Sequence, residues 1–143
     1  MTQSCDLKTR HCQACEGGVP ALSSSEVQAL LAQLQDWQLD NGQLMKCYRF
    51  KDHYQTMAFV NALAWISHRE DHHPDLQVGW GDCVVRYSTH AIKGLSENDF
   101  ICAARLDLGS RTLRISHDPI AYAVNSREAD MADIIANRVC AEL

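Results

Sequence analysis

Apolar residues recur at helical spacing in two stretches of the first half of the chain. Val27, Leu30 and Leu34 follow a serine-rich cap, which predicts an amphipathic helix that ends near Gln35. Residues 52–71 carry two apolar stripes on different faces of a longer predicted helix. Because a sheet can cover only one of these faces, we expect the other face to contact a second subunit.

Two hairpins are predicted, one between these helices and one after them. Asn41-Gly42 suits a two-residue turn because both positions accept positive φ, and Gly81-Asp82 is a second turn signal. Every second residue of the last strand, starting from Cys83, should face the helices. The strands are expected at residues 37–40 and 44–50 for the first hairpin, and at 76–80 and 83–89 for the second.

A third helix is predicted to open with Ser96 as its N-cap and Asp99 at its third position. Leu95 and Phe100 would form a hydrophobic staple across this start, and the helix is expected to end near Arg105. The order of elements is then α-β-β-α-β-β-α. This order predicts an α+β fold, in which a four-stranded antiparallel sheet made of two hairpins has helices packed on one face.

The chain divides into three expected parts. Residues 1–20 lack apolar periodicity and are expected to form a mobile leader, while residues 21–106 hold the predicted domain. Residues 107–143 form a C-terminal extension of unknown role, whose apolar positions suggest a terminal helix. With 143 residues, of which 46% are hydrophobic, the chain has the size and the apolar content of one ordinary domain.

The composition of the chain argues against several classes of function. The net charge of −5 gives no basic stripe for phosphate backbones, so direct nucleic-acid binding is not expected. No apolar run approaches the roughly 20 residues that span a bilayer, so no membrane association is expected. Seven cysteines, an odd number, are scattered through a chain with no recognisable export signal. This pattern favours free thiols in a cytoplasmic protein over a disulfide framework.

Four of the seven histidines lie close together in the sequence, on either side of the second predicted hairpin. They are His68, His72, His73 and His90. Histidine gains or loses a proton near neutral pH, so the cluster indicates acid–base catalysis. Because a proline disfavours the helical conformation in the residue before it, Pro74 should close the second helix at His73. His72 would then lie in the last turn, on the same face as His68. Two solvated histidines at a helix end are the structural alternative.

Metal sites are further alternatives. A metal hydrolase could use His68, His72 and His90, but the helical zinc-protease motif needs a glutamate directly after its first histidine, where this chain has Arg69. A zinc deaminase needs a Pro-Cys-x2-Cys segment after its His-x-Glu, and the CxxC here lies far upstream. We therefore expect no metal at the histidine cluster. A partial structural zinc site in the leader is a separate alternative that the sequence does not exclude. Its ligands would be Cys5, His11, Cys12 and Cys15.

The histidines belong to two overlapping motifs. These are His68-x3-His72-His73-Pro74-x5-Trp80-x9-His90-x8-Asp99, and Ser88-Thr89-His90 followed by Gly94-Leu95-Ser96-Glu97-Asn98-Asp99-Phe100. Together they resemble the signature of the pterin-4a-carbinolamine dehydratases, in particular the bacterial branch that accompanies phenylalanine hydroxylase. The similarity extends from about Cys12 to Arg105. The chain departs from the animal proteins at residues 75–79, where they have an aromatic-rich stretch, and residues 107–143 have no counterpart that we can identify.

The resemblance implies a hydro-lyase that removes the 4a-hydroxyl group of 4a-hydroxytetrahydrobiopterin as water. The product would be quinonoid dihydropterin, recycled for phenylalanine hydroxylase. The pterin is the substrate, and no cofactor is implied. The implied partners are this small molecule and further copies of the chain, in a homodimer or homotetramer. The implied catalytic residues are His72, His73, His90 and Asp99, and the implied substrate-binding residues are His68, Trp80, Ser88 and Thr89.

The resemblance assigns His72 and His73 to the 4a-hydroxyl side of the pterin ring and His90 to the other ring edge. It leaves open which histidine is the acid and which is the base. Relatives of this family also act as dimerisation partners or assembly factors, so a non-catalytic module with the same fold is the alternative. The helix predicted at residues 52–71 would suit such a module, because it has a second apolar face.

Overall fold

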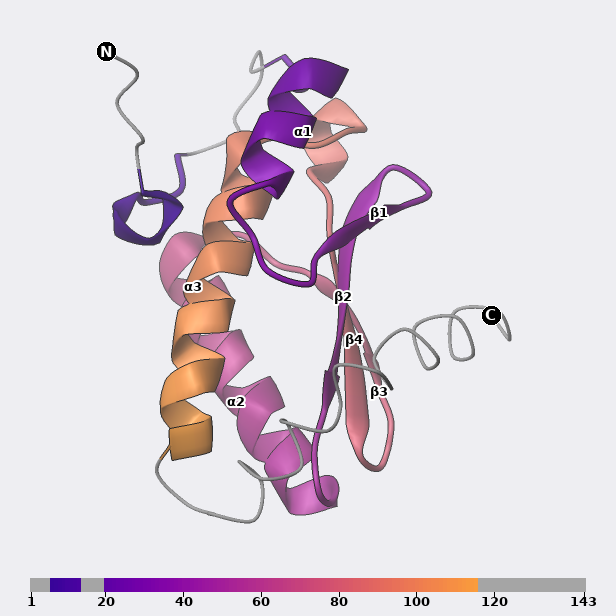
Figure 1. Ribbon diagram of the computed structural model, residues 1–143, viewed down its shortest axis with the longest axis vertical. Helices are drawn as coiled ribbons and strands as arrows, with labels where there is room; N and C mark the ends of the chain where they lie inside the picture. The colour runs from indigo at the N-terminus through magenta and orange to yellow at the C-terminus, as the bar shows by residue number, and fades with distance from the viewer. Residues whose placement is uncertain (1–5, 14–19, 116–143) are drawn as a thin grey trace. The chain divides into compact units, whose positions relative to one another are not determined.

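The computed structural model describes residues 6–13 and 20–115, and the predicted order α-β-β-α-β-β-α is confirmed in it (Figure 1). Two short 3-10 helices, η1 (Leu7–Thr9) and η2 (His90–Ile92), are additional to this order. The helices are α1 (Ser24–Leu31), α2 (His53–Glu70) and α3 (Glu97–Ile115). The strands are β1 (Gln38–Asp40), β2 (Gln43–Arg49), β3 (Asp75–Val78) and β4 (Asp82–Tyr87).

The four strands form an antiparallel sheet in the order β1-β2-β4-β3. Each predicted hairpin is present, and the second strands of the two hairpins pair with each other in the middle, with Tyr48 opposite Cys83. The first turn has φ of 48° at Asn41 and 78° at Gly42, as expected for an Asn-Gly turn. Figure 1 shows the helices gathered on one side of this sheet.

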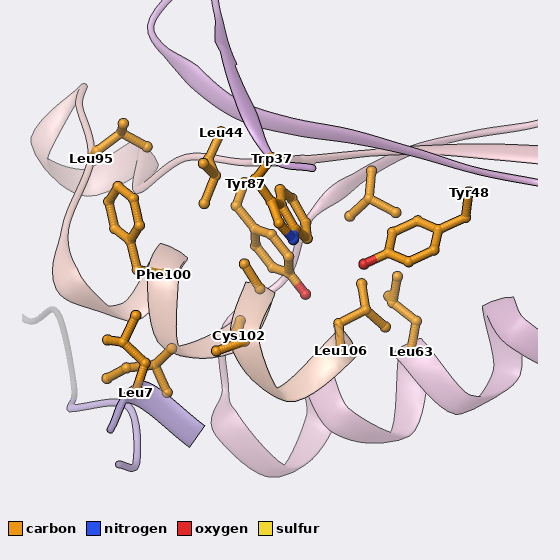
Figure 2. Close-up of a cluster of buried hydrophobic side chains, with 14 of the residues drawn as sticks. Leu7, Trp37, Leu44, Tyr48, Leu63, Tyr87, Leu95, Phe100, Cys102 and Leu106 are labelled. Atoms are coloured by element: carbon orange, nitrogen blue, oxygen red, sulfur yellow. The ribbon is translucent and has the colours of Figure 1, made fainter. Parts of the chain in front are cut away.

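The core lies between the sheet and the helices. Cys83, Val85 and Tyr87 of β4 belong to the buried core cluster, which confirms the predicted inward face of this strand. Val84, on the other face, is also buried, at 1% exposed. Figure 2 shows Tyr87 beside Trp37 and above α3. The two rings lie 6.0 Å apart between centroids. The other members of the buried cluster that Figure 2 labels are Leu7, Leu44, Tyr48, Leu63, Leu95, Phe100, Cys102 and Leu106.

Residues 6–13, which belong to the expected mobile leader, pack against the domain. Leu7 is only 2% exposed and belongs to the core cluster. The backbone oxygen of Arg10 accepts hydrogen bonds from Nε and Nη2 of Arg105, at 3.0 and 2.6 Å. A single leucine without periodic neighbours gives no pattern, so only the three-dimensional contacts reveal that this segment packs on the domain.

The second helix ends within one residue of the predicted range 52–71, but three residues before His73, the end expected from Pro74. It closes at Glu70, and Asp71 takes the left-handed conformation, with φ of 48° and ψ of 40°. The N–H groups of Asp71 and His72 both bond to the carbonyl of Ser67, which satisfies the last helical turn. The chain therefore leaves the helix at Asp71, before it reaches His73, the residue whose helical conformation Pro74 disfavours. His72 lies beyond the helix, and the predicted pairing of His68 and His72 on one helical face is wrong.

The third helix runs ten residues further than predicted, to Ile115 rather than to about Arg105. Asp107 in this extra length is buried and accepts hydrogen bonds from Trp37 Nε1, Lys46 Nζ and Tyr48 Oη, at 3.0, 2.7 and 2.7 Å. These bonds hold α3 against the sheet beyond Arg105, the residue at which the sequence predicted the helix to end. The first helix is shorter than predicted and ends at Leu31. The suggested terminal helix lies outside the described residues.

Candidate active site

His72 occupies a buried position directly after the end of α2. Its Nε2 lies 2.6 Å from Oδ1 of Asp99, and both side chains are nearly inaccessible, at 10% and 0% exposed. The imidazole ring is stacked on the ring of Tyr87, with 5.9 Å between centroids and 10° between planes. Its position is set by the left-handed turn at Asp71 on one side and by the first turn of α3 on the other.

Asp99 is the centre of a small buried hydrogen-bond network. Its Oδ2 accepts from the Ser96 N–H at 2.8 Å and from the Thr89 hydroxyl at 2.9 Å. The hydroxyl groups of Thr89 and Ser96 lie 2.6 Å apart. Since the single hydroxyl proton of Thr89 is used toward Asp99, the Ser96 hydroxyl donates to Thr89. Both groups that contact Oδ2 are thus donors.

The donors around Asp99 indicate the tautomer of His72. An ionised carboxylate can only accept hydrogen bonds, so Nε2 of His72 carries the proton in the contact with Asp99. Nδ1 is then the nitrogen that can take up a further proton. This is the arrangement by which a buried carboxylate orients a histidine for proton transfer.

Asp99 also has the structural role that its position predicts. Its carboxylate accepts the Ser96 N–H, which is one half of the predicted capping box. The other half is replaced, because the Ser96 hydroxyl bonds to Thr89. One carboxylate oxygen therefore serves the start of the helix and the other serves His72. Leu95 and Phe100, the predicted staple, are both buried in the core.

His73 and His90 differ from His72 because both are exposed. His90 begins η2, and its Nε2 lies 3.9 Å from Oδ2 of Asp75, the first residue of β3. The side chains of His90 and Asp75 are 75% and 63% exposed, so solvent screens this ion pair and its contribution to stability is small. The contact nevertheless brings His90 next to the segment that follows His73-Pro74. The three predicted catalytic histidines therefore lie in segments that flank the open end of the β3–β4 hairpin.

Two of the predicted substrate-binding residues lie at this end of the hairpin. Thr89 is buried in the Asp99 network, and the Ser88 hydroxyl accepts a hydrogen bond from Gln43 Nε2 at 3.3 Å. Trp80 lies in the turn between β3 and β4, at the opposite end of the hairpin, with its side chain 69% exposed. His68 is exposed on α2. Within one chain, the structure does not bring Trp80 or His68 to the His72–Asp99 pair.

A buried carboxylate that the sequence did not indicate lies two residues before His72. Oε2 of Glu70 accepts the Cys12 N–H at 2.9 Å, and Oε1 lies 3.0 Å from Nη1 of Arg105 and 3.2 Å from Nδ1 of His11. Burial alone raises the pKa of Glu70, but the Cys12 N–H, Arg105 and His11 outweigh it and lower the pKa. Glu70 therefore remains ionised and ties the end of α2 to α3.

The metal-hydrolase alternative requires several ligands to converge. Among residues 6–13 and 20–115, no group of three or more His, Cys, Asp or Glu side chains is placed to hold a metal ion. His68, His72 and His90 are therefore not assembled as a metal site. Cys5 and Cys15 of the leader lie outside the described residues, so the partial zinc site is untested. In the same described part of the chain, no helix is long and apolar enough to cross a membrane.

Comparison with known proteins places the chain in a family. The family model for pterin 4 alpha carbinolamine dehydratase matches residues 20–108. A pterin-4-alpha-carbinolamine dehydratase of Nitrosomonas europaea is 61% identical over 109 residues, which cover 76% of this chain and 96% of the relative. One of Legionella pneumophila is 50% identical over 105 residues, covering 71% of this chain and 93% of the relative.

A solved structure shares the fold. The crystal structure of a transcriptional coactivator/pterin dehydratase from Brucella melitensis superposes with a TM-score of 0.59 at 27% sequence identity. The match covers 62% of this chain and 96% of that protein. The region matched by the family model includes every strand of the sheet and the residues of the His72–Asp99 pair. The chain therefore belongs to the pterin-4-alpha-carbinolamine dehydratase family.

Proposed function

We propose that this chain is a hydro-lyase that eliminates water from 4a-hydroxytetrahydrobiopterin to give quinonoid dihydropterin. Membership of the family and the names of relatives at 50–61% identity support the reaction class. The observation that carries the proposal is the buried His72–Asp99 pair, with 2.6 Å between Nε2 and Oδ1. A stability role alone does not require a titratable ring beside a fully buried carboxylate.

The elimination needs two proton transfers and no redox change. The proton on N5 of the pterin leaves to a base, the C4a–O bond breaks, and an acid delivers a proton to the departing hydroxyl group. The products are water and the pterin with a double bond between N5 and C4a. Each assisted transfer contributes on the order of 10²- to 10⁴-fold in rate.

The chain offers histidines for both transfers. His72 is held by Asp99 through Nε2, so its Nδ1 exchanges the proton while Asp99 stabilises the imidazolium form. His73 and His90 are exposed and keep contact with solvent, so they can return to their starting protonation state after each turnover. We assign His72 and His73 to the 4a-hydroxyl side of the ring and His90 to the opposite edge, with either side able to hold the base.

Alanine substitution tests this proposal. His72→Ala and His90→Ala should each lose most of the turnover above the spontaneous dehydration, by about 10²-fold or more. His53→Ala is the matched control, because His53 is an exposed histidine at the first residue of α2. Dehydration of 4a-hydroxytetrahydrobiopterin, followed by absorbance in a stopped-flow instrument, measures all three. Wild-type turnover in both His72→Ala and His90→Ala would refute the proposal.

A second candidate function is a non-catalytic partner protein with the same fold. It is favoured by the exposed aromatic face of α2, where Tyr54 is 83% and Trp65 is 60% exposed. The Brucella melitensis relative carries both descriptions, transcriptional coactivator and pterin dehydratase. Absence of any turnover in the wild-type chain, with a well-folded protein, would favour this second function.

The same face of α2 supports a homodimer or homotetramer. Tyr54, Met57 and Trp65 are spaced so that they lie on one side of the helix, and each is exposed in the single chain. Apolar side chains grouped in this way are typical of interfaces between identical subunits. The cytoplasmic location, the supply of pterin to phenylalanine hydroxylase and the absence of a cofactor stay predictions.

A further inference from the structure

Two cysteines far apart in the sequence meet beside the site. Sγ of Cys12 lies 3.5 Å from Sγ of Cys102, although 90 positions separate them. Cys102 is a fully buried residue of α3 and lies among the core side chains (Figure 2). Cys12 is half-buried in the N-terminal segment. We propose that Cys12 and Cys102 form an oxidisable dithiol site, which small organic disulfides such as glutathione disulfide convert to an intramolecular disulfide bond.

The backbone on both sides of Cys12 is held against the helices that carry its partner. The Cys12 N–H donates to Glu70 at 2.9 Å, and the backbone oxygen of Arg10 is bound by Arg105. The next residue, Gln13, donates its N–H to Oδ1 of Asn98 at 3.1 Å and accepts from Nδ2 of Asn98 at 2.7 Å. Cys102 follows Asn98 by one helical turn, so these bonds keep the two thiols together.

The remaining displacement is small. A disulfide bond requires about 2.05 Å between the sulfur atoms, so the thiols must approach by roughly 1.5 Å. Rotation of the half-buried Cys12 side chain and a slight shift of its segment can supply this movement. The hydrogen bonds of Arg10 and Gln13 to α3 need not break, because the segment moves toward the helix to which it is already bound.

The other two described cysteines do not form such a pair. Cys83 lies opposite Tyr48 in the sheet, so Cys47 projects from the face opposite to Cys83. Burial raises the pKa of Cys83 to about 11, which keeps this thiol protonated and unreactive at neutral pH. Reactivity toward disulfides is therefore expected at Cys12, where a partly accessible thiol has a second thiol within reach.

The oxidation consists of two successive thiol–disulfide exchanges. The Cys12 thiolate attacks glutathione disulfide, forms a mixed disulfide and releases one glutathione thiolate. Cys102 then loses its proton to a released thiolate and attacks the Cys12 sulfur, which releases the second glutathione. The two cysteines lose two electrons, and one glutathione disulfide becomes two glutathione thiols. Cys102 reacts second because its hydrogen bond with Cys12, together with burial, raises its pKa.

The bond would close a loop of 90 positions and so restrict the unfolded chain. Full-length protein is incubated with glutathione disulfide, alkylated and digested without reduction. We expect a peptide in which Cys12 is linked to Cys102, and a thermal midpoint higher by roughly 5–15 °C that dithiothreitol reverses. Cys47→Ser, which replaces another half-buried cysteine, should keep this shift, while Cys12→Ser should abolish it.

Peptide mapping distinguishes the proposal from other oxidation products. A disulfide between Cys12 and Cys15, or a glutathione that stays on Cys12, would overturn the proposal. The same holds for a midpoint shift that persists in Cys12→Ser. The Cys12→Ser variant is the decisive one, because Cys12 is only half-buried and its replacement leaves the core position of Cys102 unchanged.

Discussion

Replacing Asp99 by asparagine separates its structural role from its role toward His72. The amide keeps the size of the side chain and one acceptor oxygen, but it loses the charge and gains an NH2 group. Two donors, the Ser96 N–H and the Thr89 hydroxyl, converge on Oδ2. The amide oxygen is therefore expected at that position, because an NH2 group there would face two donors. The NH2 group is then directed at Nε2 of His72.

This orientation inverts the tautomer of His72. Nε2 must accept from the introduced amide instead of donating to the Asp99 carboxylate, so the ring proton moves to Nδ1. Nδ1 is the nitrogen that the proposed mechanism uses to exchange a proton, and the new tautomer removes its lone pair. The missing carboxylate also no longer stabilises the imidazolium form. The expected loss is therefore close to the full contribution of one proton transfer, about 10²- to 10⁴-fold in turnover.

The loss of stability should be smaller than the loss of rate. Hydrogen bonds to a charged acceptor contribute roughly 1 kcal/mol more than neutral ones, and three such bonds are affected. The expected decrease in unfolding free energy is about 1–3 kcal/mol, against a rate effect that corresponds to about 3–5 kcal/mol in the barrier. A domain of ordinary stability, about 5–15 kcal/mol, then stays almost fully folded.

The comparison requires turnover and a urea midpoint on the same preparation of Asp99→Asn. Glu97→Gln is the matched control, because it removes a negative charge from the same helical turn without touching His72. Nitrogen chemical shifts of the imidazole of His72 report the tautomer directly. Turnover within about twofold of the wild type, with only the urea midpoint lowered, would show that Asp99 acts as a helix cap alone. The catalytic assignment of Asp99 would then be withdrawn.

Further predictions concern stability, pH dependence and assembly. Leu7→Ala should lower the unfolding free energy by about 2–4 kcal/mol in urea titration, because Leu7 is 2% exposed, whereas the neighbouring exposed Lys8→Ala should change it by less than about 0.5 kcal/mol. The pKa of Glu70 is lowered from 4.5, so its ionised form stabilises the fold above about pH 4.5, and this stability is lost as the pH falls below that value. Glu70→Gln should therefore make stability less dependent on pH in the acid range, and an unchanged pH profile would contradict the assignment. Trp65→Ser should weaken self-association in sedimentation equilibrium, and a wild-type monomer at micromolar concentration would refute the α2 interface.

The features that the sequence predicts well are local. The turn at Asn41-Gly42 follows from two adjacent residues, and the contact of Asp99 with the Ser96 N–H joins residues three positions apart. The motif also placed His72 and Asp99 in one predicted site, and the fold brings these two residues into contact although 27 positions separate them. The antiparallel four-stranded sheet was also predictable, because two hairpins of this length leave few ways to form one sheet.

The features that the sequence did not predict depend on distant contacts. Glu70 looks like an ordinary charged residue at a helix end, and its partner Cys12 is 58 positions away. The rule for residues before proline gives only the latest position at which α2 can end. It does not give the earlier reversal at Asp71, which rests on one residue that tolerates the left-handed conformation. His68 was therefore assigned to a shared face with His72 that does not exist.

The attachment of the N-terminal segment has a consequence for the order of events during synthesis. Gln13 and Arg10 leave the ribosome early, but their partners Asn98 and Arg105 follow 85 and 95 positions later. At about 5–20 residues per second, the segment that contains Leu7 waits roughly 5–20 s for the helix on which it docks. The hairpins and α2 can form during that interval. The segment at residues 6–13 is therefore expected to be the last part of the domain to dock, although it is the first to be translated.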